Sequence, residues 1–118
     1  MKQILIVEDE YMIALVLEKQ IRHNGWEVLA VVDNGKEAIS MVREHRPDVV
    51  LMDITLRGEM DGTEAMKEIR SFSDVPVIYL TGNAESHAIV KTKGTRPTAI
   101  LIKPVASDDL LETIRKVT

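Results

Sequence analysis

Five polar residues of this chain have side chains that suit phosphoryl chemistry beside a metal ion: Glu8, Asp9, Asp53, Thr81 and Lys103. Three carboxylates in one small space repel one another unless their pKa values rise or a cation joins them. Hard oxygen donors of this kind suit Mg²⁺, which is commonly bound by one or two carboxylates plus a phosphate. A lysine and a hydroxyl beside a carboxylate can stabilise a phosphoryl group that the carboxylate carries. These residue types therefore imply Mg²⁺-dependent phosphoryl transfer to Asp53.

These residues can meet only if the apolar runs that precede them lie side by side. Five short runs rich in Val and Ile recur at nearly even spacing, and such residues favour β-strands. The runs are residues 4–7, 28–32, 49–52, 75–80 and 99–102. Segments with helical periodicity separate the runs, so strands and helices alternate along the chain. This alternation predicts an α/β fold with one parallel sheet and helices on both faces.

Strand order decides which strand ends are neighbours. In the flavodoxin-like, doubly wound order 2-1-3-4-5, strands one and three lie in the middle of a five-stranded sheet. Ligands of such sheets bind beyond the carboxyl ends of the strands. With this order the five polar residues converge at one edge of the sheet. Asp33 follows the outer second strand, where we expect it to cap a helix.

Sequence signals also mark helix ends. Asp61 with Glu64 forms a variant capping box, in which the aspartate accepts from the backbone and the glutamate reaches back. Asn24 before Gly25 predicts the end of the first helix, since glycine commonly follows a helix C-terminus. The helix expected at residues 84–93 has the weakest pattern, because its apolar residues are consecutive rather than spaced.

Length and composition narrow the class of protein. The 118 residues suit one domain that spans residues 1–118. The formal net charge of -4 argues against a nucleic-acid partner, because binding to phosphates needs a basic surface. There is no apolar stretch of membrane-spanning length and no cysteine, so we expect no membrane partner and a cytoplasmic location.

Taken in chain order, the segments around the five polar residues resemble the receiver domain of two-component response regulators. The matching segments are Val7-Glu8-Asp9-Glu10, Leu51-Met52-Asp53-Ile54, Leu80-Thr81-Gly82, Ile102-Lys103-Pro104, and the loop from Asp53 through Gly58 to Gly62. The resemblance covers nearly the whole chain. Each motif is weak alone, but their combination in this order is highly specific.

The resemblance implies a role for each carboxylate. Asp53 would be the phosphoacceptor, and the phosphoryl group would come from a phosphohistidine on a sensor histidine kinase or a phosphotransfer protein. Glu8, Asp9 and Asp53 would ligate Mg²⁺, with the backbone carbonyl of Thr55 as a further ligand. A protein of this kind phosphorylates and dephosphorylates itself as a switch and is not a turnover enzyme.

The resemblance also implies how the switch reaches a partner. Lys103 would bind the phosphoryl oxygens, and Thr81 would move toward the phosphoryl group. The signalling surface would comprise the helix at residues 84–93, the strand at residues 99–102 and the last helix. A downstream output protein or domain would read this surface, and the same surface is where a homodimer would form.

Three features depart from the family pattern. Ile100 stands three residues before the lysine, where the family usually has Tyr or Phe, so Thr81 and its loop would have to carry the signal. The connection at residues 94–98 is longer than usual, which predicts a displaced or irregular preceding helix. Arg57 stands where Pro is common, which would alter the loop over the site.

Two other functions fit parts of the same pattern. A haloacid-dehalogenase-type phosphatase would also use an aspartate nucleophile, but Thr55 stands where its second acid would be. A flavodoxin-like FMN carrier would need a phosphate-binding loop after the first strand and aromatic walls for the flavin. Here that loop contains Glu8, Asp9 and Glu10, which would repel phosphate without a metal ion, and aromatic residues make up only 3% of the chain.

Overall fold

The computed structural model describes residues 2–82 and 93–117, and its centre is a five-stranded parallel sheet. The strand order is β2-β1-β3-β4-β5, which confirms the predicted order. The strands are β1 (Gln3–Val7), β2 (Glu27–Val32), β3 (Val49–Asp53), β4 (Val77–Thr81) and β5 (Ala99–Ile102). The fourth strand was predicted to begin at Val75, but it begins at Val77. Pro76 has no N–H to donate to a neighbouring strand, which accounts for the later start.

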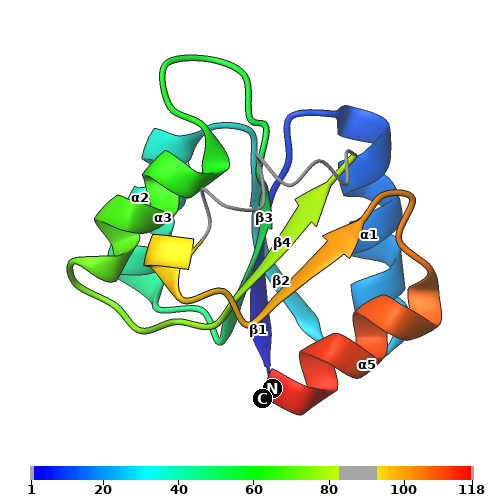
Figure 1. The fold of residues 1–118 in the computed structure, drawn as a ribbon. Helices are drawn as coiled ribbons and strands as arrows, with labels where there is room; N and C mark the ends of the chain where they lie inside the picture. Colours follow the sequence, from blue (N-terminus) through cyan, green and yellow to red (C-terminus); the bar gives the residue numbers. More distant parts are fainter. Residues whose placement is uncertain (1, 83–92, 118) are drawn as a thin grey trace.

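Helices cover both faces of the sheet, as predicted (Figure 1). Helices α2 (Gly35–His45) and α3 (Gly62–Arg70) cover one face, and α1 (Tyr11–His23) and α5 (Ser107–Val117) cover the other. A short 3-10 helix, η1 (Lys93–Thr95), precedes β5. The helix predicted at residues 84–93 lies almost entirely outside the described residues. Within the described ranges, no helix combines the length and apolar character that crossing a bilayer requires.

The central strand β3 is buried along its whole length, so both of its faces contribute to the core. Val50 and Met52 face the cluster under α2 and α3, whereas Val49 and Leu51 face the cluster under α1 and α5. The alternation follows from the two-residue period of a strand. A run of four apolar residues that ends in a carboxylate therefore places Asp53 at the rim of the core.

Two helix starts follow local sequence signals. The predicted capping box is present at α3, where Asp61 accepts from the Glu64 backbone and Glu64 accepts from the Asp61 backbone. At α2, however, Asn34 is the cap and accepts from the backbone N–H of Glu37. The prediction that Asp33 caps this helix was wrong. Asp33 instead accepts from the side-chain amide of Asn34.

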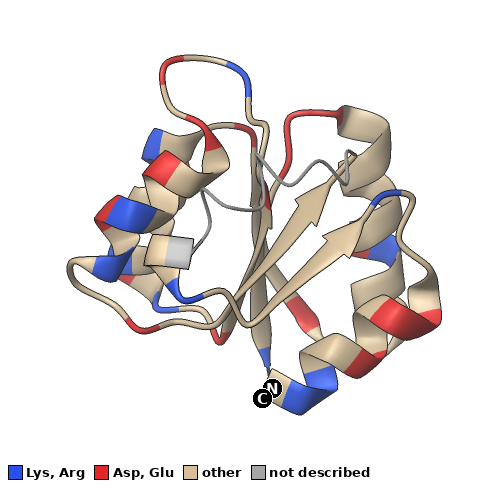
Figure 2. Cartoon of the chain, viewed as in Figure 1, with Lys and Arg blue, Asp and Glu red and all other residues tan. Residues whose placement is uncertain are grey.

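The register of the strands brings their carboxyl ends to one edge. Val7 pairs with Met52, so Glu8 and Asp53 follow a matched pair of strand residues. Asp53 pairs with Leu80, and Thr81 pairs with Ile102. The segment that joins β1 to α1 is acidic and lies at this edge, close to the end of β3 (Figure 2).

Candidate functional site

Three carboxylates meet at the carboxyl edge of the sheet. Glu8, Asp9 and Asp53 each offer an oxygen atom within 4.8 Å of the others. Glu8 and Asp53 are 2% exposed, while the side chain of Asp9 is 12% exposed. Buried carboxylates this close need a partner of opposite charge to remain ionised.

Lys103 supplies that partner from the end of β5. Its Nζ lies 2.5 Å from Glu8 Oε1 and 3.2 Å from Asp53 Oδ2. Burial acts to lower the pKa of Lys103, but hydrogen bonding to Glu8 and the charge of Asp53 outweigh it, so the pKa is raised. Burial raises the pKa of Glu8 to about 7, with Lys103 opposing the rise and Asp53 adding to it. The site is an ion-paired cluster with more negative than positive groups.

Asp53 is held in place by Thr55, two residues further on. The backbone N–H of Thr55 donates to Asp53 Oδ1 at 3.0 Å, and its hydroxyl lies 3.2 Å from the same oxygen. The sequence assigned Thr55 only a backbone carbonyl role and missed these two contacts. The sequence pattern that predicts them is an aspartate followed two positions later by a hydroxyl residue. An aspartate side chain commonly accepts from the backbone N–H two residues further on, and the hydroxyl can donate to the same oxygen.

Asp9 is oriented by Arg57 from the loop between β3 and α3. The backbone N–H of Arg57 donates to Asp9 Oδ2 at 2.9 Å, and Arg57 Nε lies 3.7 Å from the same oxygen. Proline at this position would have no N–H to donate. The departure from the family pattern at residue 57 thus adds both a hydrogen bond and a positive charge next to one candidate metal ligand.

Thr81 ends β4 and joins the other strand ends through its main chain. Thr81 is fully buried, and its carbonyl oxygen accepts from the backbone N–H of Lys103 at 2.7 Å. One residue earlier, the carbonyl oxygen of Leu80 accepts from the backbone N–H of Ile54 at 3.0 Å. The structure therefore brings all five sequence-predicted residues to one edge, and backbone hydrogen bonds link the ends of β3, β4 and β5.

Gly62 allows the start of α3 to pack directly behind Asp53. A Cβ atom at Gly62 would overlap the backbone carbonyl oxygen of Asp53, so no larger residue fits without movement of the backbone. Sequence reasoning treated this glycine only as part of the loop motif. The close approach depends on a tertiary contact between β3 and α3, which local sequence signals do not encode.

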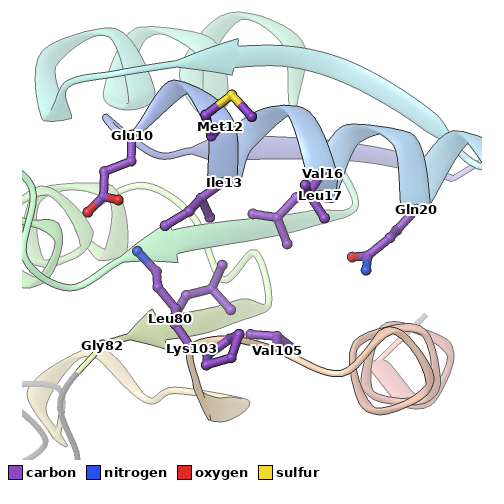
Figure 3. Close-up of a pocket in the computed structure, with 11 residues that line it drawn as sticks. Glu10, Met12, Ile13, Val16, Leu17, Gln20, Leu80, Gly82, Lys103 and Val105 are labelled. Atoms are coloured by element: carbon purple, nitrogen blue, oxygen red, sulfur yellow. The ribbon is translucent and has the colours of Figure 1, made fainter.

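An apolar groove of about 530 Å³ runs beside the carboxylate cluster, between α1 and the connection from β5 to α5 (Figure 3). Ile13 and Leu17 of α1 face Leu80 and Val105 across it, and Lys103 forms part of its wall. Apolar surroundings lower the local dielectric and strengthen the ion pairs of a buried charge. Because only 12% of the Lys103 side chain is exposed, its contacts with the carboxylates are favoured in this way.

The donor atoms of the cluster fit a hard divalent cation. Three carboxylates within reach of one another offer only oxygen ligands, which Mg²⁺ prefers over nitrogen or sulfur. Burial is the main cause of the elevated pKa of Glu8, and the neighbouring Asp53 adds to it. The oxygen donors and the crowding of three carboxylates agree with a site that completes its charge balance by binding a cation.

Comparison with known proteins gives the family. The family description "response regulator receiver domain" matches residues 4–115. This chain belongs to the response regulator receiver domain family. The receiver domain is 33% identical over 115 residues to the chemotaxis protein CheY of Bacillus subtilis, with 97% of this chain and 95% of that protein covered. It spans about half the length of two longer relatives that it also matches, the transcriptional regulatory protein PdtaR of Mycobacterium tuberculosis (55%) and the DNA-binding response regulator MtrA of Mycolicibacterium paratuberculosis (50%).

Solved structures agree with this assignment. The signal receiver domain of a diguanylate cyclase from Desulfovibrio desulfuricans superposes with a TM-score of 0.91 at 36% identity, covering 98% of this chain and 91% of that one. The receiver domain of the sensor histidine kinase PA1611 from Pseudomonas aeruginosa gives a TM-score of 0.89 at 30% identity, with coverages of 98% and 95%. In that structure a magnesium ion is coordinated in the active-site cleft.

Proposed function

We propose that this receiver domain is a phosphorylation-activated switch in which Asp53 accepts a phosphoryl group from a phosphohistidine. The donor would be a sensor histidine kinase or a phosphotransfer protein. The observation that carries the proposal is the position of Asp53. It is a nearly buried carboxylate at the end of the central strand, 3.2 Å from the ammonium group of Lys103 and grouped with two further carboxylates.

The transfer would exchange one bond to phosphorus for another. A carboxylate oxygen of Asp53 attacks the phosphorus atom, and a P–O bond forms as the P–N bond to the donor imidazole breaks. The electron pair of the broken bond leaves with the imidazole nitrogen, which takes up a proton. Thr55 fixes Asp53 through Oδ1, so the carboxylate would need little reorientation before attack.

Lys103 and Thr81 would bind the incoming group. Lys103 is already in contact with Asp53, and its charge would pair with phosphoryl oxygens once the group is attached. The hydroxyl of Thr81 would donate to the same group. Because the backbone N–H of Lys103 donates a hydrogen bond to the carbonyl oxygen of Thr81, movement of either residue would affect the other.

The metal-binding part of the proposal assigns Mg²⁺ to the carboxylate cluster. Glu8, Asp9 and Asp53 would hold the ion, with the backbone carbonyl of Thr55 as a further ligand. When bound, the ion supplies positive charge that offsets the negative charge of the phosphoryl oxygens. Arg57 would keep Asp9 oriented toward the cluster through its backbone N–H.

The signal would leave through the surface that contains β5 and α5. The helix predicted at residues 84–93 belongs to this proposed surface but lies almost entirely outside the described residues. An output protein or domain would recognise the surface, and a homodimer would use the same face. A new charged group at Asp53 would bias this surface because the ends of β3, β4 and β5 are linked by backbone hydrogen bonds.

Small phosphodonors test the proposal without the cognate kinase. Incubation with acetyl phosphate or phosphoramidate and Mg²⁺ should add one phosphoryl group, detected by intact mass measurement. Asp53→Asn should abolish the addition, and so should removal of divalent metal with a chelator. Labelling that persists in either case would contradict the proposal. Steady release of phosphate from phosphate esters would favour the phosphatase, and a bound yellow flavin would favour the FMN carrier.

A further inference from the structure

A hydrogen-bonded hydroxyl pair joins β4 to η1 on the sheet face that α2 and α3 cover. The hydroxyl of Tyr79 lies 2.6 Å from the hydroxyl of Thr95, and both residues are fully buried. The backbone carbonyl of Thr95 also accepts from Arg70 Nε at 2.7 Å. Burial raises the pKa of Tyr79 to about 12, so its hydroxyl keeps its proton at neutral pH.

Tyr79 is close to the phosphoryl-accepting site along the chain. It lies two residues before Thr81 on β4, so the two side chains leave the strand on the same face. Leu80, between them, pairs with Asp53 in the sheet and accepts from the backbone N–H of Ile54. A displacement of the end of β4 on phosphorylation would therefore be transmitted to Tyr79, which lies only two residues from that end.

The neighbour of Tyr79 on β5 is a smaller, aliphatic side chain. Tyr79 pairs with Ile100, the residue that stands where the family usually has an aromatic side chain. Ile100 is only partly buried and packs against the same core cluster as Tyr79. Tyr79 thus places a large aromatic ring beside the smaller, partly buried Ile100.

Resting on the proposed function, we propose that the Tyr79–Thr95 pair is a positioning contact of the unphosphorylated domain that is released when Asp53 carries a phosphoryl group. The hydrogen bond is short and directional, so a small shift of β4 would forfeit it. Contacts that are either made or broken convert small shifts into two states.

Beryllium fluoride, bound together with Mg²⁺, mimics the phosphoryl group. Its affinity separates a contact that belongs only to the unphosphorylated state from one that stabilises both states. A hydrogen bond that stabilises both states equally leaves the dissociation constant of the mimic unchanged. If the pair belongs only to the unphosphorylated state, Tyr79→Phe and Thr95→Val should each tighten binding by about threefold to tenfold, the range that one buried neutral hydrogen bond can supply. The double variant should bind no more tightly than either single variant.

Two matched variants complete the experiment. Thr95→Ser keeps the hydroxyl and should bind the mimic as the unchanged protein does, even if Thr95→Val folds poorly. Ile21→Val removes one methyl group from the other core cluster and should leave binding unchanged while lowering stability. The dissociation constants can be measured from amide chemical shifts during titration.

The outcomes distinguish this inference from the proposed function. Unchanged or weaker binding in Tyr79→Phe and Thr95→Val would overturn the inference, as would effects that add in the double variant. If acetyl phosphate still labels the protein in that case, the proposed function stands without the Tyr79–Thr95 contact. A protein that neither binds the mimic nor takes a phosphoryl group would overturn both.

Discussion

Removing the side chain of Arg57 should strengthen Mg²⁺ binding. Arg57 Nε lies 3.7 Å from Asp9 Oδ2, one of the oxygens that we assign to the metal. Its guanidinium therefore repels a cation bound by Asp9. Arg57→Ala deletes this charge and keeps the backbone N–H that orients Asp9, so repulsion is the main interaction that changes.

The size of the effect follows from this geometry. A carboxylate oxygen binds Mg²⁺ at about 2.1 Å, which places the ion no more than about 6 Å from Arg57 Nε. The Arg57 side chain is 80% exposed, so the dielectric constant of water applies. A single and a double positive charge at about 6 Å in water repel by about 1.4 kcal/mol. Physiological salt screens this to about 0.7 kcal/mol, which corresponds to about threefold tighter binding.

A titration of amide chemical shifts with Mg²⁺ measures this change. Arg57→Lys keeps the charge and is the matched control, so its dissociation constant should stay near that of the unchanged protein. The gain in Arg57→Ala should shrink as salt is raised, because only screened repulsion has been removed. Equal affinities of Arg57→Ala and the unchanged protein at low salt would refute the reasoning, and so would an equal gain in Arg57→Lys.

Three further predictions concern charge and packing at the same site. Asp53→Asn should raise the urea midpoint of the metal-free protein, because it removes one of three crowded carboxylates; an unchanged midpoint would contradict this crowding. The pKa of Glu8 is raised from 4.5 to about 7, so the folded state holds a proton that the unfolded state releases. The stability of the metal-free protein should therefore fall as the pH rises from about 4.5 to about 7, and the fall should be smaller in Glu8→Gln. For the same reason Mg²⁺ binding, measured by titration, should weaken as the pH falls below about 7. Gly62→Ala should lower the free energy of unfolding by about 3 kcal/mol, because its Cβ would overlap the Asp53 carbonyl. Gly94→Ala, with open space around the added Cβ, is the control, and equal losses in the two variants would show that the overlap is unimportant.

The fold was largely predictable because its signals are local. Runs of Val and Ile, helical periodicity and the Asp61–Glu64 capping box act within a few residues. The wrong helix cap arose where two neighbouring residues could serve the same purpose. Asp33 and Asn34 can both cap a helix, and only the backbone geometry at Asn34 selects it.

The site was predictable in its members but not in its contacts. Parallel strands end at one edge, so polar residues after the strands must gather there. The sequence does not show which atoms then meet, because the loop after β3 sets these contacts. The N–H of Arg57 on Asp9 and the pair of contacts from Thr55 to Asp53 are of this kind.

The two ends of the described chain meet on the side of the domain opposite the carboxylate cluster (Figure 1). The ammonium of Lys2 and the guanidinium of Arg115 lie 5.7 Å and 5.9 Å from the centre of the same indole ring, that of Trp26. A strand of five residues separates this side from Asp53, a distance of about 16 Å. A fluorophore or surface tether attached at either end would therefore leave the approach to Asp53 open. The same closeness makes the chain suitable for circular permutation, with new ends placed in a surface loop.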